Sequence, residues 1–334
     1  MTLSAMTATD RASALRKAQE AVNDSFRREQ SRGGAKNGSP PRTRPVIRRA
    51  SSLPRFVGID TNQPWFNELL GGIGGLPRMR VVNIYGPRDS GKSTFAQKAA
   101  AAVIAADGIA VYIDTEGKLD PEFAKTLGMN TRELFVVDAS GHMAFEAIRK
   151  FAEELAKAKL TIDLIVIDTV TALPTTTGRG ALPTLLNAEL PPMIDLIREQ
   201  NACLLLLSQE RAIPMGEDAR IVSTGGYGLE HDSTVIVELI ILKEFHGSGG
   251  VPTGHLVEAR LRKLHAPGVM GRVKYILPKL GVSSQDLEAM CKAAPDAHRA
   301  FLPIGRGNGR GNGRAHRVNG VSPPAAGDLV SKTI

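Results

Sequence analysis

The chain has 334 residues, of which 42% are hydrophobic and 23% are charged, a balance typical of a globular protein with room for one large domain or two small ones. Its longest aliphatic stretch, residues 202–207, is too short to span a bilayer, and the first residues lack the apolar core of a signal peptide. The two cysteines, Cys203 and Cys291, have no metal-binding spacing. We therefore expect an intracellular protein without a membrane span and with incidental thiols.

The net charge of +8 is concentrated at the two ends of the chain. Residues 1–55 contain twelve Lys or Arg and only four Asp or Glu, and the tail from Asp296 contains six basic and two acidic residues. The middle of the chain is therefore acidic. This arrangement is typical of a protein that holds a polyanion partly through its arms, although solvated arms without a partner would carry the same charge.

A helix is predicted over residues 11–29, because apolar side chains recur on one of its faces. These side chains are Leu15, Ala18, Val22 and Phe26. A lone helix with one apolar stripe needs a partner surface. Residues 33–55 follow as a basic, flexible linker rich in Gly, Pro, Ser and Arg, in which residues 45–47 could add a short strand to a neighbouring sheet.

Residues 56–280 alternate apolar strands with helices, which predicts an α/β core with a mainly parallel, twisted sheet flanked by helices. The first strands expected are Val81–Tyr85, Ala110–Ile113, Leu134–Val137, Leu164–Ile167 and Leu204–Ser208. The later ones lack long helices between them and are expected to be antiparallel additions at one sheet edge: Val235–Leu242, His255–Leu264 and Arg272–Ile276. A short helical piece in residues 281–303 and a disordered Gly/Arg tail in residues 304–334 follow.

The most specific motif lies between the first of these strands and an alanine-rich helical stretch, Phe95–Ala106. It reads Gly-x-x-x-x-Gly-Lys-Ser, the pattern of a phosphate-binding P-loop. Glycines let backbone N–H groups surround a polyphosphate at the start of a helix, while Lys92 reaches the terminal phosphates and the Ser93 hydroxyl binds Mg²⁺. The residues expected to bind the nucleotide are Gly86, Pro87, Arg88, Asp89, Ser90, Gly91, Lys92, Ser93 and Thr94.

Two further strands end in carboxylates. Asp168 follows Ile165-Val-Ile, the Walker B arrangement, and is expected to hold the Mg²⁺ together with Ser93. Glu116 follows Val111-Tyr-Ile-Asp-Thr and could orient and deprotonate the water that attacks the γ-phosphate. Each acid could instead be a solvated carboxylate at a strand end.

A neutral amide, Gln209, follows the strand Cys203–Ser208 and leads into a loop that ends at residues 224–226. Beside the γ-phosphate, such an amide can sense whether the phosphate is present and move the loop that follows. The alternative is a glutamine that only caps the sheet.

The order of these motifs, together with Asp120-Pro, Ser-Gln-Glu-Arg, Thr-Gly-Gly and Ala266-Pro, resembles the RecA recombinase family. The resemblance covers residues 12 to about 278. It implies a RecA-like P-loop core that binds and hydrolyses ATP with Mg²⁺.

Roles can be transferred to individual positions on this resemblance. It makes Glu116 the residue that activates water, Asp168 the Walker B acid and Gln209 the γ-phosphate sensor. Asp120 and Phe123 match positions that hold the adenine, although Phe123 could simply pack in the core.

The resemblance also implies DNA binding by two loops, one after Leu173 and one over residues 211–226. The DNA contacts expected there are Arg179, Arg211, Arg220, Thr224, Gly225 and Gly226, with solvated loop residues as the alternative. The first loop is shorter than in bacterial RecA, and after Leu280 no counterpart of its duplex-binding C-terminal domain is expected. The basic linker and tail could substitute through sequence-independent attraction to phosphate.

Subunit contacts are implied as well. Residues 1–32 resemble the helix with which bacterial RecA packs on the next subunit of its filament. Lys263 matches one of two lysines that reach a neighbour's γ-phosphate, and the other position is Leu261 here. His231 instead resembles archaeal and eukaryotic recombinases or bacterial RadA, in which this histidine faces the nucleotide across the interface. A structural histidine is the alternative.

From this resemblance we expect a cytoplasmic, nucleoid-associated, DNA-dependent ATPase that forms helical homo-oligomeric filaments on single-stranded DNA. It would pair that strand with duplex DNA and catalyse strand exchange in recombination and repair. One alternative is a RecA-fold mediator similar to RadA, which hydrolyses ATP without exchanging strands. Another is a nucleotide-switched protein scaffold, for which the basic arms would be unexplained.

Overall fold

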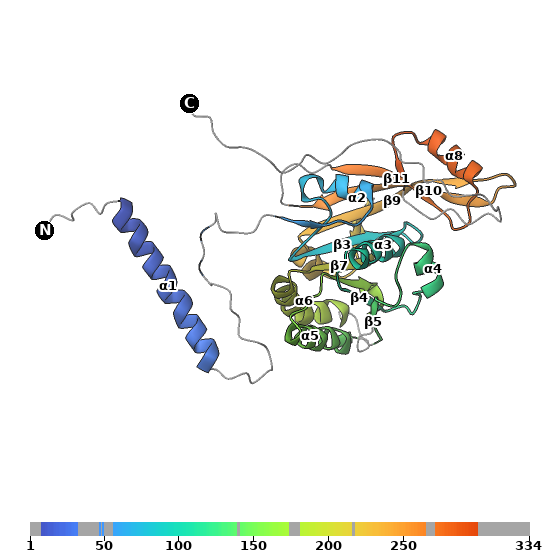
Figure 1. Cartoon of the computed structure of the whole chain (residues 1–334). Coiled ribbons are helices and arrows are strands. Elements are labelled where there is room, and N and C mark those ends of the chain that lie inside the picture. Colours follow the sequence, from blue (N-terminus) through green and yellow to red (C-terminus); the bar gives the residue numbers. More distant parts are fainter. Residues whose placement is uncertain are drawn as a thin grey trace, which may run out of the picture.

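The computed structural model describes residues 8–32, 47, 49, 56–138, 141–173, 181–215, 218–264 and 271–299. Arg179, most of the predicted linker and the predicted tail lie outside these residues. Figure 1 shows helix α1 (Ala8–Arg32) standing apart from a core in which a sheet carries helices on both faces. The helix predicted at the start of the chain is therefore confirmed, and it is longer than expected.

Helix α1 is joined by hydrogen bonds to one residue of the segment that follows it. The Asn23 side chain donates to the Ile47 carbonyl oxygen at 3.0 Å and accepts from the Ile47 N–H at 2.9 Å, while the Gln19 amide donates to the same carbonyl oxygen at 2.9 Å. Of the apolar stripe, the Leu15 side chain is 57% exposed, while Val22 is half-buried. The described residues therefore leave the first part of this stripe, at Leu15 and Ala18, uncovered.

Within the described residues, ten strands form one sheet in the order β12, β11, β10, β9, β3, β7, β6, β4, β5, with β8 paired to β7. The parallel part includes β3 (Arg80–Gly86), β4 (Ala110–Asp114), β5 (Phe135–Val137), β6 (Leu164–Asp168) and β7 (Cys203–Met215). Neighbouring strands in this part all run parallel. The predicted α/β class is confirmed, and the carboxyl ends of these strands meet at the edge where open α/β sheets bind ligands.

The prediction that all later strands are antiparallel is wrong for the first of them. Strand β9 (Val235–His246) pairs parallel with β3, and only β10 (Pro252–Lys263) and β11 (Arg272–Pro278) continue antiparallel. The reason is the short helix α7 (Gly226–Asp232). It carries the chain from the carboxyl ends of the parallel strands back to their amino ends before β9 begins.

The segment predicted as a loop from residue 211 to residue 226 is a β-hairpin instead. Strand β7 runs on to Met215 and pairs antiparallel with β8 (Asp218–Ser223), with Glu210 opposite Ser223. The β-branched pair Ile221 and Val222 favours this extended backbone. The hairpin, rather than an irregular loop, therefore follows Gln209.

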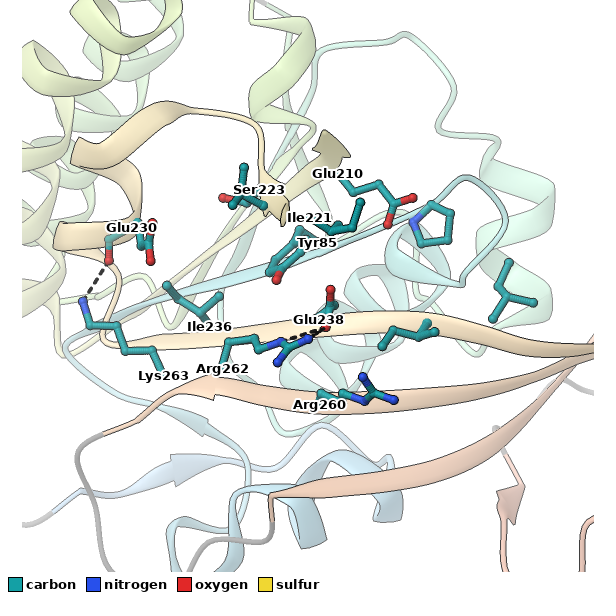
Figure 2. Close-up of a pocket in the computed structure, with 14 residues that line it drawn as sticks. Tyr85, Glu210, Ile221, Ser223, Glu230, Ile236, Glu238, Arg260, Arg262 and Lys263 are labelled. Atoms are coloured by element: carbon teal, nitrogen blue, oxygen red, sulfur yellow. Dashed lines mark hydrogen bonds and ion pairs between the residues drawn. The ribbon is translucent and has the colours of Figure 1, made fainter. Parts of the chain in front are cut away.

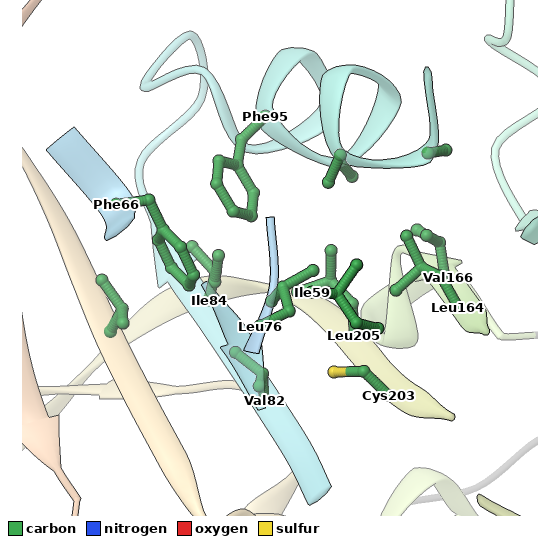
Figure 3. Packing of buried hydrophobic residues seen from close by; sticks show 14 of the residues in the cluster. Ile59, Phe66, Leu76, Val82, Ile84, Phe95, Leu164, Val166, Cys203 and Leu205 are labelled. Atoms are coloured by element: carbon green, nitrogen blue, oxygen red, sulfur yellow. The ribbon is translucent and has the colours of Figure 1, made fainter. Parts of the chain in front are cut away.

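Helices cover both faces of the sheet. On one face α2 (Pro64–Leu69) and α3 (Lys92–Ala105) pack on alternate strand residues, and Figure 3 shows Phe95 of α3 pointing toward Phe66 and Ile84. On the other face lie α5 (Gly141–Lys157) and α6 (Ala181–Gln200). Short elements complete this part of the core: β1 (Gly58–Ile59), β2 (Leu76–Pro77), α4 (Pro121–Thr126) and the 3₁₀ turns Gly71–Ile73 and Val170–Ala172.

The last described elements pack on the antiparallel edge of the sheet. Helix α8 (Ser284–Ala293) buries Met290 against Phe245 and Ile276, and β12 (His298–Arg299) pairs parallel with β11. Of the helices in the described ranges, none is both long enough and apolar enough to cross a membrane.

Candidate nucleotide-binding site

The P-loop lies between β3 and α3, as its sequence predicts, and it needs glycine at two positions. A Cβ on Gly86 would lie 2.5 Å from the Leu239 carbonyl oxygen. A Cβ on Gly91, which has a φ of 89°, would lie 2.8 Å from a methyl carbon of Leu277. Neighbouring strands therefore press on the loop from behind, and only glycine leaves room for its backbone.

The ammonium group of Lys92 lies inside the loop. Its Nζ donates to the Gly86 carbonyl oxygen at 2.9 Å and the Pro87 carbonyl oxygen at 2.5 Å, and it lies 3.4 Å from Ser90 Oγ. Burial lowers the pKa of Lys92, and nearby carboxylates, first among them Asp168, oppose this shift. The cation is thus held at the centre of the loop, where a polyphosphate would meet it.

Asp168 ends strand β6 and is almost fully buried. One of its oxygens, Oδ2, accepts a 2.6 Å hydrogen bond from the Tyr112 hydroxyl. Burial raises the pKa of Asp168, while hydrogen bonds from Tyr112 and Ser93 act in the opposite direction. The carboxylate therefore has a fixed orientation and lies beside the Ser93 hydroxyl.

A cavity of about 40 Å³ separates these groups from Glu116. It is lined by Ser93, Gln97, Tyr112, Asp114, Glu116, Lys118, Leu119 and Asp168. Hydroxyl and carboxylate oxygens are the ligands that Mg²⁺ prefers, and this ion usually takes one or two protein ligands plus phosphate oxygens and water. In the described residues no three His, Cys, Asp or Glu side chains gather as a metal-binding group. The donor set of Ser93 and Asp168 fits an ion that is held largely by the nucleotide.

Glu116 follows strand β4 and reaches the same cavity. Its Oε2 is hydrogen-bonded to the ammonium group of Lys118, and its Oε1 lies 3.4 Å from the Thr169 hydroxyl. The Lys118 side chain is 77% exposed, so this ion pair is in contact with water. Sequence reasoning missed both Lys118 and Tyr112, because a lysine in a turn and a tyrosine in an apolar strand carry no motif.

Gln209 is paired in the sheet with the first glycine of the P-loop, since Gly86 and Gln209 are in register on β3 and β7. Its N–H donates to the Thr171 hydroxyl at 3.2 Å. Its carbonyl oxygen accepts from the Thr224 N–H at 2.8 Å and from the Thr224 hydroxyl at 2.9 Å. The backbone of Gln209 thus connects the P-loop strand with both ends of the hairpin.

The two positions predicted to hold the base lie on helix α4. Asp120 accepts a 2.9 Å hydrogen bond from the Glu122 N–H and so caps the helix, and Phe123 is half-buried one turn later. Both residues follow closely after Leu119, which lines the cavity, and Asp120 caps the helix.

Lys263 and His231 lie together at the end of α7. Lys263 Nζ donates to the carbonyl oxygens of Glu230 at 2.8 Å and His231 at 2.9 Å, the last turn of α7. This is a favourable place for a cation. The His231 side chain is 74% exposed, with Nδ1 at 3.1 Å from Asp232 Oδ1.

Lys263 also lines a cavity of about 770 Å³ on the open face of β9 and β10 (Figure 2). At its base the buried Glu238 binds both Nε and Nη2 of Arg262. Burial and then the Glu238 charge raise the pKa of Tyr85 to about 12. This face thus carries a fixed set of charges beside the P-loop residue Pro87.

The predicted DNA-binding residues lie along the hairpin and at its end. Arg211 is exposed on β7, Arg220 is on the paired strand β8, and Thr224, Gly225 and Gly226 lead into α7. Arg179 lies outside the described residues. The structure therefore brings together the two arginines' strands, although sequence reasoning expected an irregular loop.

Comparison with known proteins agrees with this site. A family model, the RecA N-terminal domain, matches residues 64–182, which include the P-loop, Glu116 and Asp168. Protein RecA of Borreliella burgdorferi (strain ZS7) is 33% identical over 191 residues, covering 53% of this chain and 50% of that protein. Protein RecA of Mycobacteroides abscessus is 52% identical over 103 residues, covering 30% of this chain and 28% of that protein.

The chain spans about half the length of the first curated relatives it matches. Its similarity lies in the part that carries the phosphate loop and both strand-end acids. The part of this chain that carries the candidate site is therefore similar to the RecA N-terminal domain.

Proposed function

We propose that this protein is a DNA-dependent ATPase that forms filaments on single-stranded DNA and catalyses homologous pairing and strand exchange. The observation that carries the proposal is the double hydrogen bond between Gln209 and Thr224, because it joins the P-loop edge of the sheet to the candidate DNA-binding hairpin. The similarity of residues 64–182 to the RecA N-terminal domain supports it.

In this proposal ATP binds with its phosphates in the loop of residues 86–94. Lys92 neutralises charge on the phosphate oxygens, and Ser93 and Asp168 would hold the Mg²⁺, which would supply further positive charge there. Glu116 orients the attacking water and accepts its proton, for which it must release Lys118. Catalysis by these residues is mostly positioning and electrostatic stabilisation.

Gln209 would act as the switch between nucleotide and DNA. Its side chain contacts the γ-phosphate, and its backbone moves Thr224 and the hairpin when that phosphate is lost. Arg211 and Arg220 would then hold or release the phosphates of the single strand. Arg179, in the other candidate loop, and the basic ends of the chain would add sequence-independent attraction for single-stranded and duplex DNA.

Filament formation is supported by surfaces that the described residues leave open. The stripe on α1 is exposed at Leu15, and the edge strand β5 exposes Phe135 and Val136. A second copy of the chain would cover these surfaces. Lys263 and His231 would face the nucleotide of the adjoining subunit, and the assembled protein would act on the nucleoid in the cytoplasm.

A fluorescent oligonucleotide tests the proposal directly. We expect tight binding with a non-hydrolysable ATP analogue, weak binding without it, and continuous filaments by electron microscopy. Lys92→Ala should abolish the nucleotide-dependent binding. Binding that is indifferent to nucleotide would contradict the proposal and favour a protein scaffold.

Strand exchange requires a separate measurement, joint-molecule formation between the coated strand and a homologous duplex. Filaments that coat DNA yet form no joint molecules would favour a mediator similar to RadA. A protein that stays as separate particles with nucleotide and DNA would contradict filament formation altogether.

A further inference from the structure

The carbonyl group at the centre of the P-loop is bound by a tyrosine from a distant strand. The hydroxyl of Tyr275, on β11, donates a 2.9 Å hydrogen bond to the Ser90 carbonyl oxygen. The Ser90 side chain in turn donates to the Pro87 carbonyl oxygen at 2.8 Å, an atom that Lys92 also binds. A chain of hydrogen bonds therefore runs from β11 to the lysine that would meet the phosphates.

Tyr275 itself cannot touch a nucleotide. It is 2% exposed, and its ring stacks on Trp65 with centroids 4.3 Å apart and planes 14° from parallel. Trp65 also contacts Phe95 of α3, with centroids at 5.3 Å. The ring is thus fixed between α2 and β11, so the hydroxyl has one defined position under the loop.

A second residue of β11 supports the same loop. Leu277, two residues after Tyr275 and on the same side of the strand, is the neighbour that a Cβ on Gly91 would strike. Ser90 and Gly91 are therefore backed by adjacent side chains of one strand. Two residues far away in the sequence therefore hold the loop: Tyr275 binds its backbone at Ser90, and the Leu277 side chain packs behind Gly91.

We propose that Tyr275 is a positioning residue that holds the P-loop in the conformation that binds ATP. The inference rests on the proposed role of this loop in ATP binding. Without the hydroxyl, the Ser90 carbonyl group would lose its buried partner, and the loop would gain freedom to turn this peptide group. Phosphate-binding N–H groups would then be aligned only after ATP had ordered them, which weakens affinity.

The test compares Tyr275→Phe with the wild-type full-length protein, because phenylalanine keeps the ring on Trp65 and removes only the hydroxyl. Binding of a methylanthraniloyl derivative of ATP with Mg²⁺ gives Kd, and steady-state hydrolysis gives KM and kcat. We expect Kd and KM to rise about threefold to tenfold, the effect of one hydrogen bond, while kcat stays close to wild type.

A matched control is Ser233→Ala, which removes another buried hydroxyl that donates to a backbone carbonyl oxygen, that of Leu229 at 2.7 Å. It should lower the unfolding temperature without changing Kd. Equal Kd values for Tyr275→Phe and wild type would overturn the inference, even if Tyr275→Phe melted earlier. Failure of the wild-type protein to bind the nucleotide would contradict the proposed function itself.

The chain offers an internal reporter for the same experiment, since Trp65 is its single tryptophan. Its emission depends on its surroundings, and Tyr275 connects it to the loop. We expect Mg²⁺-ATP to change Trp65 fluorescence in the wild type and to change it less in Tyr275→Phe at saturating nucleotide. An equal change in both proteins would count against the hydrogen bond as the connection.

Discussion

The carbonyl oxygen of Gln209 accepts two hydrogen bonds from one residue, Thr224, through its N–H at 2.8 Å and its hydroxyl at 2.9 Å. The two residues lie at the two ends of the β7–β8 hairpin. A movement of the Gln209 backbone would therefore reach the end of the hairpin as well as its beginning.

Thr224→Val tests this connection, because valine keeps the shape and the N–H bond but loses the hydroxyl bond. We expect the gain in oligonucleotide affinity between ADP and a non-hydrolysable ATP analogue to fall about threefold or more, consistent with the loss of one hydrogen bond. Fluorescence anisotropy measures both affinities. Thr253→Val, at the start of β10, is the control. An unchanged affinity ratio in Thr224→Val would exclude a role for the hydroxyl in coupling.

Glu116→Gln should separate binding from hydrolysis. The amide keeps the size of the side chain but cannot accept a proton, so kcat should fall by a factor of about 10² to 10⁴ while ATP still binds. Lys118→Ala is the matched control, since the exposed ion pair contributes little and its loss should change kcat less than threefold, on the order of a weak surface interaction. A Glu116→Gln protein that hydrolyses ATP at the wild-type rate would remove this residue from the mechanism.

Tyr112→Phe should raise the Mg²⁺ concentration needed for nucleotide binding. The lost 2.6 Å hydrogen bond leaves the Asp168 carboxylate free to rotate away from Ser93. We expect the midpoint of a Mg²⁺ titration, followed by binding of fluorescent ATP, to rise about threefold or more. Binding measured in excess chelator serves as the control and should be equal in both proteins. Coincident Mg²⁺ titrations would show that Tyr112 does not orient the carboxylate.

Lys98 on α3 should make stability depend on alkaline pH. Burial lowers its pKa to about 8, so between that value and its ordinary 10.5 the unfolded chain binds more protons than the folded chain. Stability from this residue therefore rises with pH across that interval, by at most about 3 kcal/mol at about 1.4 kcal/mol per pKa unit.

Urea unfolding from about pH 7 to about pH 10 measures this effect as the difference between wild type and Lys98→Met, where methionine cannot titrate. As the pH rises, the free energy of unfolding of the wild type should increase relative to that of Lys98→Met. Lys157→Met, which removes an exposed lysine on α5, should show a constant difference. Parallel curves for Lys98→Met and Lys157→Met would show that Lys98 titrates normally in the folded protein.

The phosphate loop and the positions of Asp168 and Glu116 could be read from the sequence because each is a local pattern at the end of an apolar strand. The parallel sheet follows from the same alternation. Their proximity needs only that the carboxyl ends of parallel strands share one edge. These features can be predicted because each is encoded by a short local pattern of residues.

Other features depend on partners that local patterns do not reveal. The Tyr275 hydroxyl binds a carbonyl group 185 residues earlier in the chain, and the Tyr112 hydroxyl meets Asp168 only because β4 and β6 are neighbours. The resemblance to a DNA-binding loop of the RecA family predicts a loop after Gln209, where the structure has a hairpin. Its pairing is set by the register of β7, which begins deep in the core.

Strand β3 lies between β7 and β9, with Gly86 beside Gln209 and Tyr85 beside Glu238. Strand β7 continues into the hairpin, and strand β9 forms part of the face that carries Arg262 and Lys263. In the proposed filament, a displacement at the tip of β3 would therefore reach both the candidate DNA-binding hairpin and the candidate subunit-contact residue Lys263 through the paired strands on either side. DNA binding by the hairpin and contact between subunits would then change together, in response to the same hydrolysis of ATP at the tip of β3.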